Sequence, residues 1–273
     1  MNKLIIEALR EDLGRGDVTT EAIVQPTATG RAIIIAKQEA IVAGVEVVTQ
    51  VFKTVDRKLV VNPHKQDGDT VSVGDMVLEL RGRVSSILKG ERVALNFLSR
   101  LSGIATLTRK FVNKVAGTGV KILDTRKTIP GWRELDKYAV RVGGGYNHRM
   151  GLYDAILIKE NHIKVAGGIK PAVERVIKKW GNRYFIEVEV ENLDQLREAL
   201  DTPVDRIMLD NMSVDEIREA VKLNNGRKEL EVSGGVNLDN IREIAETGVD
   251  YISIGAITHS APAADFSLEI VSQ

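Results

Sequence analysis

The second half of the chain alternates between short apolar runs and longer segments with helical periodicity. Six apolar runs are typical of strands: KILDTR, AILIKEN, YFIEVEVEN, RIMLDN, ELEVSGG and YISIGAI. Between the later runs, apolar residues recur every three or four positions, as in AVERVIKKW, LDQLREAL, VDEIREAVKL and LDNIREIAETG. Strands that alternate with helices predict βα units around a parallel sheet.

The first hundred residues follow a different pattern. RAIIIAKQEAIVAGVEVVTQVF begins as an apolar strand, and KQDGDTVSVGDMVLELRGRVSSIL predicts short strands separated by Asp-Gly and Gly-Asp turns. From Glu91 onward, apolar residues at positions 94, 97, 98, 101, 104 and 105 form a helical stripe. This part of the chain therefore predicts a small, mostly β domain with a few helices.

Each predicted strand of the second half begins with apolar residues and ends with polar ones. The polar ends are Asp124 to Lys127, Lys159 to Asn161, Glu189, Asp210 with Asn211, Ser233 to Gly235, and Gly255. In an α/β barrel the active site forms at the C-terminal ends of the strands. An open doubly wound sheet would instead place its ligand at one switch point. Polar ends on all six strands favour a barrel, and an incomplete one, because a full barrel has eight strands.

Composition narrows the possible partners. Lys plus Arg equals Asp plus Glu, 38 against 38, so no overall field attracts nucleic acid or an acidic membrane. The chain has no cysteine, which excludes disulfides and thiolate chemistry. Its N-terminus has no long apolar core typical of a secretory signal, and no run approaches the ~20 apolar residues of a spanning helix. We expect a cytoplasmic protein.

Carboxylates recur with period two in IEVEVEN. Glu187, Glu189 and Glu191 share one face of the strand, and Asp210 ends the next strand. If that face points into the barrel, the three glutamates line its interior and mouth and need cations or a metal. A partly exposed strand with solvated glutamates is the alternative. Glu189 and Asp210 together suit a hard divalent cation such as Mg²⁺.

Cations gather near the same strand ends. Between Lys121 and Arg149 there are seven Lys or Arg against three Asp or Glu. Arginine and lysine at these positions predict an anion site, because both bind carboxylate and phosphate well. Aromatic residues make up only 4% of the chain, so stacked bases are not expected and a small polyanionic ligand fits better than nucleic acid.

Glycines follow the last two predicted strands. SGGV at 233–236 and IGAI at 254–257 let backbone N–H groups approach a phosphate, opposite the cation-rich strands. The triple glycine at 143–145 matches no nucleotide-binding motif and by itself indicates a turn. His64 and His259 carry no functional expectation, and His162 is interpreted as a loop residue. Zinc is not expected, because no two histidines have metal-site spacing.

Several motifs together resemble one known family. They are EDLGRGDVTT, ERVALNFLSRLSGIAT, DTRKTIPGWRELDKYAVRVGGGYNHRMGLYDAILIKENH, EVEVEN, LDN and EVSGGVN…DYISIGAITHS. In this order, from about Glu11 to Ser260, they are similar to the quinolinate phosphoribosyltransferases. The resemblance implies an N-terminal α/β sandwich over residues 1–103 and an incomplete α/β barrel of about seven strands over 104–265. A C-terminal tail, 266–273, would return to the first domain.

The resemblance also implies a reaction and an assembly. Quinolinate and phosphoribosyl pyrophosphate would react with Mg²⁺ present to give nicotinate mononucleotide, pyrophosphate and CO₂ in NAD biosynthesis. Neither nucleic acid nor a membrane would take part. The chain would form a homodimer with shared active sites, or a hexamer of such dimers.

The resemblance carries roles onto individual residues. The pyridine carboxylates would be bound by Arg126, His148 and Arg149, with Lys127 and Lys159 beside them and Arg92 from the partner chain. The ribose hydroxyls and the metal would be bound by Glu189 and Asp210. The 5′-phosphate would be bound by Ser233, Gly234, Gly235, Gly255 and Ala256. Catalysis would rest on Lys127, Lys159, Glu189 and Asp210.

Two other functions stay open at this point. Lys159 at the end of a barrel strand could form a Schiff base with a carbonyl substrate, as in a class I aldolase. A non-catalytic oxyanion-binding protein on the same fold, like a molybdate-associated relative of the family, is the third hypothesis. The carboxylates beside the cations argue against binding alone, because a pure anion receptor gains nothing from them.

Overall fold

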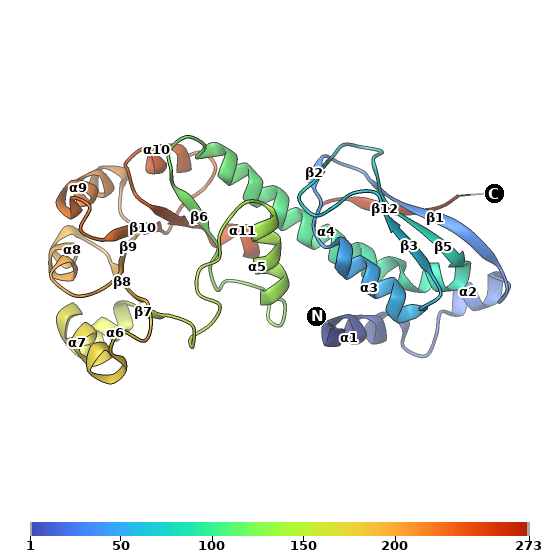
Figure 1. Cartoon of the computed structure of the whole chain (residues 1–273), viewed down its shortest axis with the longest axis horizontal. Coiled ribbons are helices and arrows are strands. Elements are labelled where there is room, and N and C mark those ends of the chain that lie inside the picture. Colours follow the sequence, from blue (N-terminus) through green and yellow to red (C-terminus); the bar gives the residue numbers. More distant parts are fainter. Residues whose placement is uncertain (1, 272–273) are drawn as a thin grey trace. The chain divides into compact units, whose positions relative to one another are not determined.

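The computed structural model describes residues 2–271, which form two compact units. Unit 1 contains the chain up to Arg109, residues 129–144 and the chain from Ser260, and unit 2 contains residues 110–128 and 145–259. Figure 1 labels most elements of both units. Within the described residues no helix combines the length and the apolar character needed to cross a membrane.

Unit 1 is built on an antiparallel sheet. Its strand order is β12 (Phe266–Val271), β1 (Thr29–Ala36), β5 (Met76–Arg83) and β3 (Val60–Pro63), and β2 (Ala40–Ile41) pairs separately with β4 (Thr70–Val71). The C-terminal strand β12 thus lies beside β1 near the start of the chain. The last two residues of the predicted tail, 272 and 273, lie outside the described residues. The helices of this unit are α1 (Asn2–Leu13), α2 (Val18–Ile23), α3 (Val45–Val55), most of α4 and α5 (Arg133–Val142).

Helix α4 (Val84–Lys114) begins earlier than the pattern predicted. The stretch from Val84 to Leu88 was expected to belong to the short strands, and that prediction is wrong because these residues form the first turns of the helix. Ile87 is fully buried and Ser86 donates to Asp56, so tertiary contacts stabilise helix where β-branched residues favour a strand. The predicted domain boundary after residue 103 falls within this helix.

Unit 2 holds a six-stranded parallel sheet. The strand order is β6 (Lys121–Leu123), β11 (Tyr251–Ser253), β10 (Glu229–Ser233), β9 (Arg206–Asp210), β8 (Ile186–Val190) and β7 (Ile156–Ile158). A single parallel bridge from Leu123 to Tyr146 is all that forms of a seventh strand among the described residues. The six predicted strands are confirmed, and so is the fold class with its incomplete barrel.

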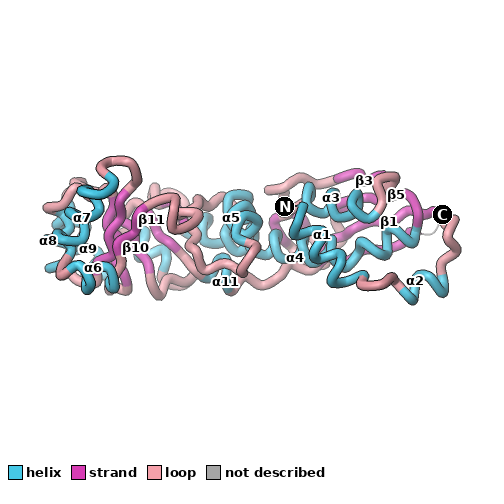
Figure 2. Tube along the Cα trace, turned by 90° about the horizontal axis from the view of Figure 1, so that it is seen from below, coloured by secondary structure: helices cyan, strands magenta, loops and turns pink. Residues whose placement is uncertain are grey.

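Helices follow the strands and cover the outside of the curved sheet. They are α6 (Glu160–Ala166), α7 (Ile169–Trp180), α8 (Leu193–Leu200), α9 (Val214–Asn224), α10 (Ile241–Ala245) and α11 (Ala256–His259). Figure 2 shows α7, α8 and α9 gathered beyond the strands of this unit. Local capping sets several starts; Ser213, for example, forms a capping box with Glu216 at the start of α9.

The strand register brings the polar strand ends to one edge. Asp210 at the end of β9 pairs with Ser233 at the end of β10, and Glu189 of β8 pairs with Met208 of β9. Because all six strands are parallel, their C-terminal ends and the loops that follow them face the same way. This edge is therefore where the predicted side chains meet.

Candidate active site

A cavity of about 520 Å³ lies at the C-terminal ends of the strands of unit 2. Every predicted site residue except Arg92 lines it: Arg126, Lys127, His148, Arg149, Lys159, Glu189, Asp210, Ser233, Gly234, Gly235, Gly255 and Ala256. Arg92 is an exposed residue of α4 in unit 1. Its contribution from a partner chain stays a prediction.

The cations of the cavity come from two edges of the sheet. Arg126 and Lys127 follow β6, and Lys159 follows β7 at the opposite end of the strand order. Arg149 lies between them and donates from Nη1 to the carbonyl of Ala155 at 3.0 Å. Burial, and then the positive charge of Arg126, lower the pKa of Arg149 below its ordinary value. Like charges held together in this way form a ready site for an anion with more than one negative charge.

The loop that carries His148 and Arg149 is anchored by Asp124. This fully buried carboxylate accepts from the backbone N–H of His148 at 2.9 Å and from the side chain of Asn147. The Nδ1 atom of His148 in turn accepts from the backbone N–H of Arg149 at 2.8 Å. The position of Arg149 therefore depends on a chain of contacts that begins at the end of β6.

The period-two carboxylates separate into two groups. Glu187 and Glu189 are buried on the inner face of β8, whereas Val188 and Val190 are buried on the opposite face. Glu191 is exposed beyond the end of the strand, and its backbone N–H donates to Gln195. The expectation that all three glutamates line the barrel is thus confirmed for two and wrong for Glu191, because the strand ends at Val190 and the chain turns toward α8.

Two carboxylates share the centre of the cavity. Glu189 accepts from Lys159 Nζ at 2.6 Å, and Asn211 donates to Asp210 at 2.8 Å. Burial, and then the negative charge of Glu189, raise the pKa of Asp210 above its ordinary value. Two carboxylates that raise each other's energy in this way fit a hard divalent cation, which would relieve the repulsion and take oxygen ligands.

The glycine loops after β10 and β11 allow close approach to the backbone. Gly234 has φ +89°, and a Cβ at this position would lie 2.1 Å from Oδ1 of Asn211, so no larger residue fits without rearrangement. A Cβ on Gly255 would lie 2.9 Å from Cδ of Lys127. Lys127 therefore crosses the second glycine loop. The sequence predicted that the cations and the glycine loops lie on opposite sides of the cavity. This prediction is confirmed for Lys159, which follows β7 at the far end of the sheet. It is wrong for Lys127, because Lys127 follows β6, the direct neighbour of β11.

The triple glycine has a structural role. A Cβ on Gly143 would lie 2.5 Å from the carbonyl of Ala105, and Gly144 has φ +94°. The first glycine lets the end of α5 pack closely on α4, and the second turns the chain. The prediction of a turn is confirmed.

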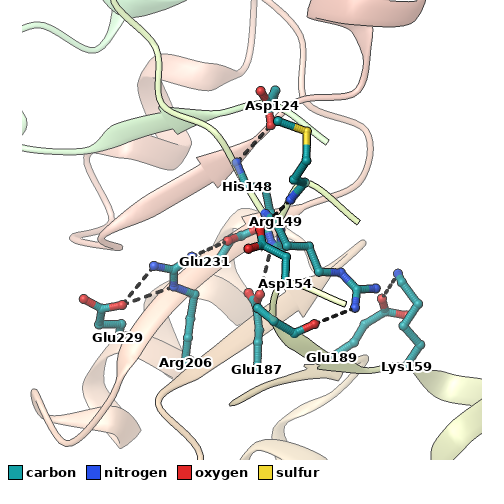
Figure 3. A network of polar contacts seen from close by, with 12 residues as sticks. Asp124, His148, Arg149, Asp154, Lys159, Glu187, Glu189, Arg206, Glu229 and Glu231 are labelled. Carbon is teal, nitrogen blue, oxygen red and sulfur yellow. Dashed lines mark hydrogen bonds and ion pairs between the residues drawn. The ribbon is translucent and has the colours of Figure 1, made fainter. Parts of the chain in front are cut away.

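Sequence reasoning missed several residues near the cavity. His259, for which no function was expected, lines the cavity from α11. Beneath the cavity floor, Arg206, Glu229 and Glu231 form a polar network with Glu187 and His148 (Figure 3). ELEV in β10 repeats the period-two carboxylates of IEVEV in β8. This repeat was the sequence pattern that could have predicted Glu229 and Glu231 on the inner face of the sheet.

Comparison with known proteins supports one family. Residues 17–102 match the model of the N-terminal domain of quinolinate phosphoribosyl transferase, and residues 104–269 match that of its C-terminal domain. The chain is 44% identical over 270 residues to a probable nicotinate-nucleotide pyrophosphorylase (carboxylating) of Bacillus subtilis, covering 99% of this chain and 93% of the relative. It is 44% identical to the chloroplastic enzyme of that name from Oryza sativa subsp. japonica, covering 96% of this chain and 76% of the relative.

Solved structures agree with this. NadC from Streptococcus pyogenes superposes with a TM-score of 0.95 at 42% identity, covering 99% of this chain and 97% of that one. The nicotinate-nucleotide pyrophosphorylase from Francisella tularensis gives a TM-score of 0.95 at 44% identity, covering 98% and 95%. With both domain models matched in order and this near-complete coverage, the chain belongs to the quinolinate phosphoribosyltransferase family.

Proposed function

We propose that this chain transfers the phosphoribosyl group of phosphoribosyl pyrophosphate to quinolinate and releases CO₂, giving nicotinate mononucleotide and pyrophosphate for NAD biosynthesis. The observation that carries the proposal is the division of one cavity into three chemically distinct parts. Arg126, Arg149 and Lys159 line one part, the carboxylates Glu189 and Asp210 stand at the centre, and the glycine loops after β10 and β11, with Lys127 beside the second, form the third. Each part suits one group of the two substrates.

The cationic part suits the two carboxylates of quinolinate. Arg126, Arg149 and Lys159 bring positive charge from separate elements, and a dianion would offset both the burial and the repulsion from Arg126 that lower the pKa of Arg149. Binding the ring by its carboxylates also orients its nitrogen, which has to attack the ribose carbon as pyrophosphate leaves. Orientation of this kind removes a large part of the barrier to a reaction between two bound molecules.

The central carboxylates suit the charge that develops on the ribose. Departure of pyrophosphate leaves a centre with the character of a ribosyl cation, and the negative side chains of Glu189 and Asp210 stabilise it electrostatically. The same two residues would hold Mg²⁺, which when bound offsets the negative charge of the pyrophosphate. Ser233, Gly234 and Gly255 also line the cavity, and backbone N–H groups of their loops would bind the 5′-phosphate.

Loss of CO₂ follows from the chemistry of the ring. Once the nitrogen is bonded to ribose it is positively charged, so it can stabilise the electron pair left on the adjacent carbon when the carboxylate leaves as CO₂. A proton then takes the place of the carboxylate on that carbon. The side chains that held the dicarboxylate keep the ring oriented through this step.

The Schiff-base hypothesis is disfavoured by one contact. Lys159 Nζ lies 2.6 Å from Glu189 Oε2, so this nitrogen is engaged as a donor to a carboxylate instead of being available to attack a carbonyl carbon. Borohydride trapping with carbonyl compounds tests this hypothesis directly, and an adduct at Lys159 would restore it.

The assembly and location belong to the same proposal. We infer a cytoplasmic homodimer in which Arg92 of one chain completes the site of the other. Arg92 is exposed and Val93, Ala94 and Leu95 beside it are buried, so the arginine is free to meet another molecule while its helix stays in the core of unit 1. Sedimentation of the purified chain would distinguish a dimer from a hexamer of dimers.

The test is an assay for nicotinate mononucleotide with phosphoribosyl pyrophosphate and Mg²⁺, with quinolinate or nicotinate as the acceptor. Product from quinolinate alone, lost in Lys127→Ala and Lys159→Ala, is the expected result. Lys164→Ala is the matched control, because Lys164 is an exposed residue of α6 paired with Glu160. Folded wild-type protein that makes no product from quinolinate would refute the proposal.

A further inference from the structure

The interior of the unit 2 sheet contains a buried column of charged side chains. Glu231 is fully buried and Glu187 is 2% exposed. Arg206 binds Glu231 through Nη1 at 3.1 Å and Glu229 through Nη2 at 3.0 Å, with its guanidinium 3.8 Å from the ring centre of Tyr251. Barrel interiors are usually filled with branched apolar residues, and buried ion pairs often stabilise less than such residues would. The column therefore calls for a reason other than stability.

His148 is where this column meets the cavity. Its Nε2 atom lies 2.9 Å from Glu187 Oε2 and 3.6 Å from Glu231 Oε1, while its Nδ1 atom accepts from the backbone N–H of Arg149 (Figure 3). Because Nδ1 accepts a hydrogen bond, the ring proton is on Nε2, the ring atom that lies near both carboxylates. Both ring nitrogens thus lie next to polar groups of the chain itself.

A metal ion is the alternative occupant of this cluster. Ligand atoms of His148, Glu187 and Glu231 lie within 4.8 Å of one another. A metal would need the lone pair of Nε2, however. Nδ1 accepts the hydrogen bond from Arg149, so the proton of the neutral ring is on Nε2 and that lone pair is not available. Arg206 also already supplies positive charge to Glu231. The geometry favours a scaffold for His148 over a metal site.

We infer that Glu231, together with Glu187, is a positioning residue for the dicarboxylate end of the cavity. The two carboxylates hold the imidazole of His148 in one tautomer and one orientation. Nδ1 of that ring then holds the backbone of Arg149, whose guanidinium is held at its other end by the carbonyl of Ala155. This inference rests on the proposed function, since it assigns Arg149 to quinolinate.

Glu231→Gln tests the inference with little change in shape. The amide oxygen can still accept from Arg206, but its NH₂ group faces the proton on Nε2 of His148, so the ring loses its single orientation. Glu229→Gln is the matched control, because it is the same change on the same strand with the same Arg206 partner, one layer farther from His148. We expect Glu231→Gln to raise KM for quinolinate at least tenfold, with KM for phosphoribosyl pyrophosphate within twofold of wild type. Glu229→Gln should leave both within twofold.

Other outcomes overturn the inference. An unchanged KM for quinolinate in folded Glu231→Gln, an equal rise in both KM values, or an equal effect of Glu229→Gln would each indicate a role in folding only. Wild-type protein without activity would instead refute the proposed function. The orientation of the His148 ring would then be tested by NMR, which does not depend on activity.

Nitrogen NMR of the imidazole rings reads the tautomer of His148 directly and requires no activity. The chain has four histidines, so comparison with His148→Asn identifies the signals of His148. The wild-type protein should show the neutral Nε2–H tautomer at neutral pH, and Glu231→Gln should show a mixture of tautomers. A wild-type ring that is protonated on Nδ1 would overturn the inference, even if the Glu231 variant failed to fold.

Discussion

Glu231 is expected to make the stability of the protein depend on pH. Burial first, and then the charge of Glu187, raise the pKa of Glu231 from its ordinary value of 4.5 to about 7. Between these two pH values the folded chain holds a proton on Glu231 that the unfolded chain has released. The contribution of Glu231 to the free energy of unfolding is therefore fully present below about pH 4.5 and is lost as the pH rises through 7.

The magnitude follows from the difference between the two pKa values. A rise from 4.5 to about 7 corresponds to about 3 kcal/mol of destabilisation by the ionised side chain, at ~1.4 kcal/mol per pH unit. Glu231→Gln removes the ionisation. The free energy of unfolding of the variant, minus that of the wild type, should thus increase by about 2–3 kcal/mol between pH 5 and pH 8.

Urea denaturation at the two pH values measures this difference. Glu229→Gln is again the control, because it is the same substitution on the same strand at a side chain that is 44% exposed and not buried. Together with the expected loss of quinolinate affinity, a more stable Glu231→Gln at pH 8 would show that the buried charge is kept for function at the expense of stability. The reasoning is refuted if the difference is the same at pH 5 and pH 8, or if the variant becomes relatively less stable at the higher pH.

Further changes test the cavity and the scaffold. Lys159→Ala should lower kcat/KM at least 100-fold, as expected for ~3 kcal/mol of lost electrostatic stabilisation. Its melting temperature should change little, because the side chain of Lys159 is 47% exposed. Activity within tenfold of wild type would contradict the catalytic role of Lys159. Gly234→Ala should raise KM for phosphoribosyl pyrophosphate more than Gly235→Ala does. The reason is that a Cβ at position 234 would lie 2.1 Å from Asn211, whereas a Cβ at position 235 would meet no atom within 4 Å. Equal effects of the two substitutions would indicate backbone strain alone. Ser213→Ala should cost ~1 kcal/mol of unfolding free energy by removing a helix cap, with kinetic constants unchanged, and a kinetic effect would mean that α9 reaches the site. Removal of Mg²⁺ with a chelator should abolish product formation, and full activity without divalent cations would refute the assignment of the central carboxylates.

Local patterns in the sequence determined much of this protein. The six strands of unit 2 and the residues at their C-terminal ends were predictable, because apolar periodicity is local and parallel strands place all such ends at one edge. The resemblance of the motifs to a known family then predicted the substrates. The cavity contains each site residue predicted within unit 2, from Arg126 to Ala256.

Other features depend on residues that are far apart in the chain. The start of α4, the exposure of Glu191 and the neighbours of Lys127 follow from packing and strand order, which no local pattern specifies. The buried column is the clearest case. Glu187, Arg206 and Glu231 come from three strands, and only their shared register places Arg206 3.1 Å from Glu231 and both glutamates beside His148. The sequence by itself determined which chemical groups the protein has and the elements that carry them, whereas the tertiary structure decided which of these groups meet in the interior, because the pairing of distant strands sets those distances.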